Sequence, residues 1–126
     1  MLDFKYMKIL IRTKNLELTE NLKGFIEEKI GSLKKFVDVL KREEENKTLA
    51  EIFFEVEKET KHHNKGEVFR SEAKILLPGR KIMAQASGDD LFLTIVEIKD
   101  KLQQELKKYK EKIITTSRRK QQKDTL

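Results

Sequence analysis

The sequence contains no cysteine, one proline and five glycines, and it has no long apolar run. Without cysteine, the chain has no disulfides, thiolate nucleophiles or cysteine-based zinc and iron–sulfur sites. Its longest apolar stretches, such as residues 9–11, are far too short to cross a bilayer. No basic start followed by an apolar signal region precedes the first expected strand. We therefore expect a soluble, cytoplasmic protein without a membrane partner.

The length and composition predict a single folded domain. The chain has 126 residues, enough for one continuous core but not for two independent ones. Apolar residues make up 37% of the chain and charged residues 40%. This composition is lean in core material yet far from that of a disordered chain, so we expect a thin core.

Hydrophobic periodicity predicts the element order β-α-β-β-β-α. The expected elements are a strand at 6–13, a helix at 20–36 capped by Thr19, strands at 50–59, 68–77 and 81–86, and a last helix opened by a capping box of Ser87 and Asp90. The polar residues 41–48 and 62–66 are expected to form a loop and a hairpin turn. These elements predict an α+β fold in which two helices pack on one face of a four-stranded sheet.

The last part of the chain carries the excess positive charge. Residues 99–123 hold ten basic and three acidic groups, whereas the net charge of the whole chain is +6. Such a concentration indicates a surface that faces a polyanion, although cations also complement the C-terminus of any helix. We expect residues 1–112 to form the folded domain, and the polar residues 113–126 to form a flexible basic tail.

Three lysines of the last helix form the strongest candidate site. Lys101, Lys108 and Lys112 are spaced by seven and four residues, so they share one helix face, and we expect Lys107 and Lys110 to flank it. A row of this kind can follow the phosphates of a nucleic acid. Arg118, Arg119 and Lys120 would extend the row as an arm that orders on binding.

Other candidate groups give weaker signals. Phe53 lies on the polar side of its strand and could stack a base, pack on a neighbouring strand or contact a protein partner. The adjacent His62 and His63 are expected to be solvated turn residues, because no cysteine or further histidine can complete a metal site. No serine has a nucleophile signature, so we expect no enzyme, no metal, no cofactor and no small-molecule substrate.

Three segments together resemble the bacterial ribosome hibernation-promoting factors of the ribosome-associated inhibitor family. They are Ile-Arg-Thr-Lys-Asn-Leu-Glu-Leu-Thr at 11–19, Ile-Gly-Ser-Leu-Lys-Lys-Phe at 30–36, and the last helix, with Asp-Asp-Leu-Phe at 89–92 and Leu-Lys-Lys at 106–108. The resemblance covers about residues 7–112. The chain looks like the short form, without the second C-terminal domain of long members. Gln104 occupies a position that can be basic in relatives.

The resemblance implies a fold similar to double-stranded RNA-binding domains and a partner, the small ribosomal subunit with its ribosomal RNA. Binding in the channel of messenger and transfer RNA would inhibit translation by occupancy and preserve inactive ribosomes under stress. The basic positions that match the family's RNA-facing groups are Lys14, Lys23, Lys29, Lys101, Lys108 and Lys112. The assignment of Lys14, Lys23 and Lys29 as RNA-facing residues rests mainly on the resemblance. Binding of this kind requires no oligomer.

Two other functions use parts of the same surface. A general double-stranded RNA-binding domain would use the same lysines without a ribosome. A protein–protein modulator of a transcription factor would instead use the open sheet face around Phe53.

Overall fold

The computed structural model describes residues 2–4, 7–38, 50–59 and 67–124, and it describes side chains at 7–37, 50–59 and 67–112. The elements are β1 (Leu2–Phe4), β2 (Met7–Lys14), α1 (Glu20–Gly31), α2 (Lys34–Asp38), β3 (Ala50–Glu59), β4 (Val68–Leu77), β5 (Arg80–Gly88) and α3 (Leu91–Asp124). The expected loop at 41–48 and the turn at 62–66 lie outside the described residues.

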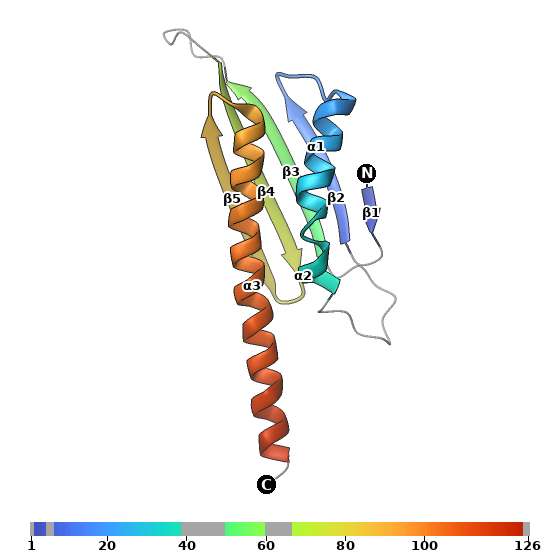
Figure 1. The fold of residues 1–126 in the computed structure, drawn as a ribbon, viewed down its shortest axis with the longest axis vertical. Coiled ribbons are helices and arrows are strands. Elements are labelled where there is room, and N and C mark those ends of the chain that lie inside the picture. The colour runs from blue at the N-terminus through green and yellow to red at the C-terminus, as the bar shows by residue number, and fades with distance from the viewer. Residues whose placement is uncertain (1, 5–6, 39–49, 60–66, 125–126) are drawn as a thin grey trace.

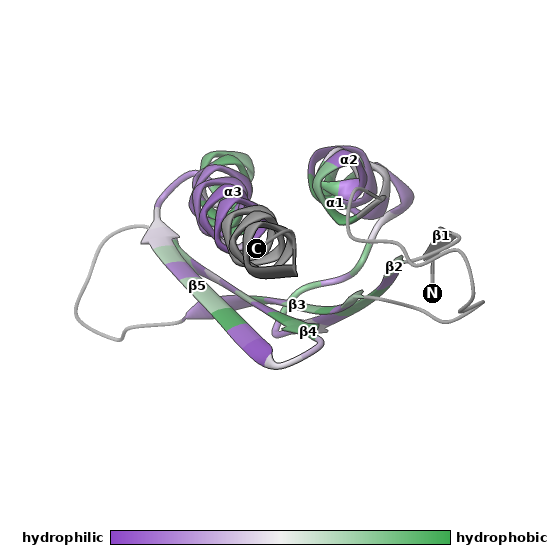
Figure 2. Cartoon of the chain, turned by 90° about the horizontal axis from the view of Figure 1, so that it is seen from below, coloured by the Kyte–Doolittle hydropathy of each residue, from purple (hydrophilic) through white to green (hydrophobic). Residues whose placement is uncertain are grey.

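The strands form one mixed sheet in the order β1-β2-β3-β4-β5. β2 and β3 are parallel and are connected through α1 and α2, whereas the other neighbouring strands are antiparallel. All three helices lie on the same face of the sheet, with α1 and α2 beside α3 (Figure 1, Figure 2). The α+β class, the β-α-β-β-β-α order and the position of the helices are therefore confirmed.

The sheet has five strands where the sequence predicts four. β1 adds a three-residue strand at the edge, where Leu2 to Phe4 pair with Ile9 to Met7 of β2. This strand is too short for its pattern of apolar residues to distinguish it from a loop.

The predicted helix at 20–36 is divided into α1 and α2. The Thr19 cap is confirmed, because its Oγ1 accepts a hydrogen bond from the backbone N–H of Leu22 at 3.1 Å. α1 ends at Gly31, and the next side chain, Ser32, donates from Oγ to the carbonyl of Lys29 at 2.6 Å. Glycine disfavours a helix and serine bonds to the local backbone, so the helix breaks here.

One prediction about α3 is wrong, and the helix is longer than its apolar stripe indicates. Ser87 is not a helix cap, because it lies in β5 opposite Arg70, and Asp90 Oδ1 accepts the N–H of Leu93 at 3.2 Å instead. α3 continues past residue 112 to Asp124. Residues 113–124 contain neither glycine nor proline and are rich in good helix formers, so the helix propagates. A separate tail after residue 112 stays a prediction.

The core fills the space between the helices and one face of the sheet. Its buried side chains include Ile26 and Ile30 of α1, Phe54 of β3, and Ile98 and Leu102 of α3. On β3 the buried and exposed positions alternate over residues 50–54, so the other face of the sheet is open. The expected antiparallel pairing of β3 and β4 is confirmed. β4 and β5 are connected by a turn at Pro78-Gly79, where Gly79 adopts a φ of +76°.

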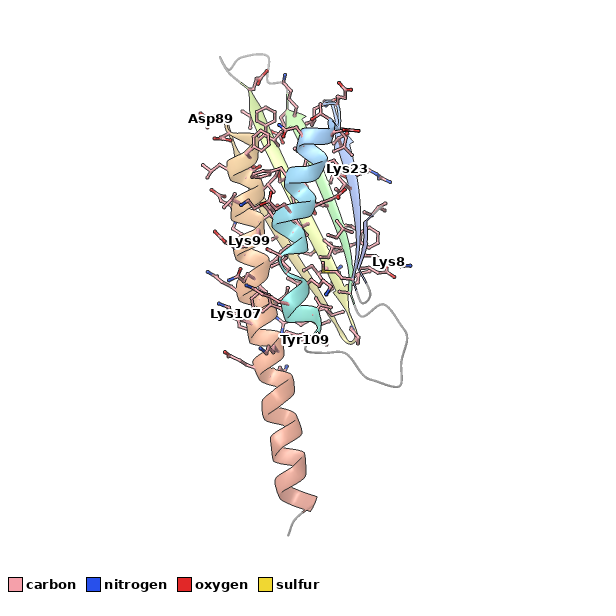
Figure 3. The ribbon with its side chains drawn as sticks, turned by 45° about the vertical axis from the view of Figure 1, so that its right-hand side comes forward. Lys8, Lys23, Asp89, Lys99, Lys107 and Tyr109 are labelled. Atoms are coloured by element: carbon pink, nitrogen blue, oxygen red, sulfur yellow. The ribbon has the colours of Figure 1, made fainter. Side chains whose placement is uncertain are left out.

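Tyr109 fixes the middle of α3 to the turn between β4 and β5. Its hydroxyl donates to the carbonyl oxygen of Pro78 at 2.7 Å, and the residue is buried (Figure 3). We expect Tyr109→Phe to lower the free energy of unfolding by about 1 kcal/mol, the usual net value of one such hydrogen bond. Urea titration followed by circular dichroism measures this change. Unchanged stability would show that the hydrogen bond does not hold the helix.

Candidate nucleic-acid interface

Helix α3 is positioned by its apolar stripe and by polar contacts with the sheet. Ile95, Ile98, Leu102 and Leu106 are buried against the core. The Arg80 guanidinium on β5 lies 3.1 Å from the Glu105 carboxylate. A buried hydrogen bond of 2.8 Å joins the hydroxyls of Ser71 and Thr94. These contacts set the rotation of α3, and this rotation decides which lysines face which side.

Lys101, Lys108 and Lys112 are exposed on the side of α3 that borders β5, as the spacing predicts. We call these three residues the β5 flank. Lys101 Nζ donates to the carbonyl oxygen of Gln85 on β5 at 2.6 Å. Lys108 Nζ lies 3.4 Å from Glu105, which also pairs with Arg80. The side chain of Glu105 therefore neutralises part of this flank at its centre.

Lys107 lies on the opposite side of α3, beside α2. Its Nζ is 5.9 Å from the ring centroid of Phe36, so it faces the space between the helices. Lys110 follows three residues later and is half-buried, on the same side by helix geometry. The prediction that Lys107 and Lys110 flank Lys101, Lys108 and Lys112 is wrong, because the basic groups occupy two flanks of the helix.

A set of cations on aromatic rings occupies the space between α1, α2 and α3. We call Lys29, Lys35 and Lys107, with the rings of Phe25 and Phe36, the inter-helix cluster. Lys29 Nζ is 5.5 Å from the Phe25 centroid, and Lys35 Nζ is 5.3 Å from the Phe36 centroid. Phe25 in turn packs edge-on against Phe92 of α3, with 4.8 Å between centroids. The sequence reasoning missed Lys35 and these rings, although the spacing of Phe25 and Lys29 by four residues indicates such a contact.

The remaining predicted residues are dispersed. Lys23 is exposed on α1 and lies 3.8 Å from Glu27 (Figure 3). Lys14 lies 3.6 Å from Glu57 on the sheet face opposite the helices, so the structure does not bring it together with the helical lysines. Arg118, Arg119 and Lys120 belong to the part of α3 that extends past the sheet (Figure 1).

The described residues hold neither a cluster of metal ligands nor a membrane span. No group of three histidine, cysteine, aspartate or glutamate side chains comes together there as a metal site. None of the helices in those residues is long and apolar enough to span a membrane. His62 and His63 lie outside the described residues.

The fold and its surface define a class of small α+β domains that present basic helices on one side of a mixed sheet. The family model described as "Sigma 54 modulation protein / S30EA ribosomal protein" matches residues 9–114, and the chain belongs to this family. The predicted family is thus confirmed. The matched segment contains β3, β4, β5, α1 and α2, and the lysines of both flanks of α3.

Known proteins similar to this chain include two ribosome hibernation promoting factors. That of Pseudomonas putida is 27% identical over 106 residues, which cover 84% of this chain and 89% of that protein. That of Escherichia coli K12 is 29% identical over 107 residues, which cover 85% and 97%. A ribosomal subunit interface protein from Coxiella burnetii shares the fold, with a TM-score of 0.63, 24% identity, and coverage of 82% of this chain and 98% of that one.

Proposed function

We propose that this protein binds the small ribosomal subunit in the channel of messenger and transfer RNA and inhibits translation there. Occupancy of the channel, without any chemical step, would preserve inactive ribosomes in the cytoplasm under stress. The observation that carries this proposal is the family match over residues 9–114, which spans both groups of helical lysines. The names of the two relatives, ribosome hibernation promoting factors, agree with it.

The RNA-facing groups would be the β5 flank and the basic residues along the helices. They are Lys101, Lys108 and Lys112, with Lys23, Lys29, Lys107 and Lys110, and further along α3 Arg118, Arg119 and Lys120. Lys14 would contact RNA only if the partner reached around the end of β2, because it points to the other face. Because the cations lie on two flanks of one helix, an RNA surface that surrounds the helix would contact more of them than a single straight row of phosphates would.

A translation assay with purified ribosomes tests the inhibition. We expect the protein to inhibit strongly when it is added before messenger RNA, and weakly when it is added to ribosomes already engaged with messenger and transfer RNA. Competition for one channel causes this difference. Equal inhibition in both orders would contradict binding in the channel.

The C-terminal part of α3 should strengthen binding without defining the site. Truncation after Lys112 removes Arg118, Arg119, Lys120 and Lys123, and we expect affinity for the small subunit to fall about tenfold or more at moderate salt but to stay measurable. Sedimentation of the truncated protein with purified subunits measures the loss. Complete loss would place the site in the helical extension instead of the domain.

A further inference from the structure

The face of the sheet opposite the helices carries an open apolar row. Leu10 on β2, Phe53 on β3 and Met83 on β5 are 45%, 37% and 49% exposed. The register of the strands places Leu10 beside Phe53, and Lys74 separates Phe53 from Met83. With Arg12, Glu55 and Glu72, this row lines a shallow pocket of about 300 Å³. Exposed apolar side chains gathered in this way indicate a contact surface.

The charges around Leu10 and Phe53 are sorted by strand. On this face β2 carries Lys8, Arg12 and Lys14, and β3 carries Glu51, Glu55 and Glu57. The parallel register sets each cation beside one carboxylate, as Lys8 with Glu51, Arg12 with Glu55 and Lys14 with Glu57. A basic column thus runs beside an acidic column, and each is interrupted by one apolar residue at the same level.

We propose that this face binds a second copy of the chain across a two-fold axis that runs parallel to the strands, between β2 and β3. Such an axis lays β2 of one copy over β3 of the other without shifting the register. Arg12 then faces Glu55 of the partner subunit, and Leu10 faces the partner's Phe53. An apolar centre flanked by complementary charges is the ordinary anatomy of a specific interface.

The charge pattern selects this axis over the other face-to-face arrangements. An in-plane axis perpendicular to the strands would lay β2 over β2 and bring Lys8, Arg12 and Lys14 against cations. A parallel axis that runs along β3 would bring each glutamate against its own copy. Like charges placed in this way repel each other, so only the axis between β2 and β3 pairs opposite columns.

The overlap is small, so the dimer is weak. β2 overlaps β3 over about eight residues, whereas the three-residue β1 covers only part of β4, so about 350 Å² of each copy is covered, as in a weak and transient contact. The helices lie on the other side of the sheet (Figure 2), and Lys8 points away from them (Figure 3). The dimer therefore leaves the β5 flank and the inter-helix cluster accessible to RNA.

Sedimentation equilibrium of the full chain from about 10 μM to about 1 mM tests the dimer at low salt. We expect a reversible dimer, and we expect Phe53→Glu to weaken it about tenfold or more. Leu93→Glu is the matched control, because Leu93 is also an exposed apolar residue but lies on α3, on the other side of the sheet. A monomer at all concentrations, or equal weakening by both variants, would overturn the proposal.

A charge exchange tests the axis even if one variant is less stable. Arg12→Glu and Glu55→Arg should each abolish the dimer, since each variant places like charges across the interface. In an equal mixture the introduced glutamate of one variant faces the introduced arginine of the other, and the second contact keeps the native pair of Arg12 and Glu55. The dimer should therefore return as a heterodimer.

Two results of these association experiments would refute the proposal. Failure of the two variants to associate, while circular dichroism shows both folded, would refute this axis. Association of the unmodified chain with an unrelated protein only, and not with itself, would refute the second copy as the occupant.

Discussion

Replacing Lys101, Lys108 and Lys112 together by glutamate should reduce affinity for the small ribosomal subunit by about a hundredfold or more at moderate salt, because three phosphate contacts are lost and three repulsions are added. All three side chains are exposed on the β5 flank, so the fold should stay intact. Sedimentation with purified subunits measures the affinity, and circular dichroism checks the fold.

The matched control for the triple variant changes the same amount of charge on the other face. Lys8, Lys74 and Lys81 lie on the open side of the sheet, away from the helices. Their replacement by glutamate alters the net charge of the protein equally, so a general electrostatic effect would weaken binding as much. We expect this control to keep most of its affinity. Equal loss in both variants would mean that net charge, and not the β5 flank, governs binding.

Phe54→Ala should lower the free energy of unfolding by about 3–5 kcal/mol, the usual range for removing a buried aromatic side chain. Phe54 is 1% exposed and lies between Ile11 and Ala73 in the sheet register, so its loss leaves a cavity in a thin core. For a small domain this is a large part of the total stability. Urea denaturation followed by circular dichroism measures the change.

The adjacent residue is the natural control for Phe54. Phe53 is the same residue type on the same strand, but it points to the open face and is 37% exposed. Phe53→Ala at low protein concentration should cost less, about 1–2 kcal/mol, because part of the Phe53 side chain is already exposed to solvent in the folded protein. If the two variants were equally destabilised, the assignment of buried and open faces on β3 would be wrong.

The sequence predicted the layers of the fold because periodicity reports burial directly. The alternation on β3 and the stripe of Ile95, Ile98 and Leu102 on α3 both follow from which side faces the core. The spacing of Lys101, Lys108 and Lys112 likewise predicted a shared exposed face. These features depend only on neighbours along the chain.

The missed features depend on contacts between elements. Lys107 lies beside Phe36 because of how α3 is rotated against α2, which no spacing within one helix reveals. Asp90 caps α3 in place of Ser87 because β5 continues through Ser87 in register with β4. The inter-helix cluster likewise exists only because α1 and α3 pack side by side, through their aromatic rings.

Sedimentation of the purified protein with isolated small and large ribosomal subunits, over a salt series and with excess RNA duplex, tests the central proposal most directly. The proposal predicts saturable binding to the small subunit that weakens with salt and withstands the duplex. Equal binding to both subunits and to the duplex, or no binding to the small subunit, would contradict it.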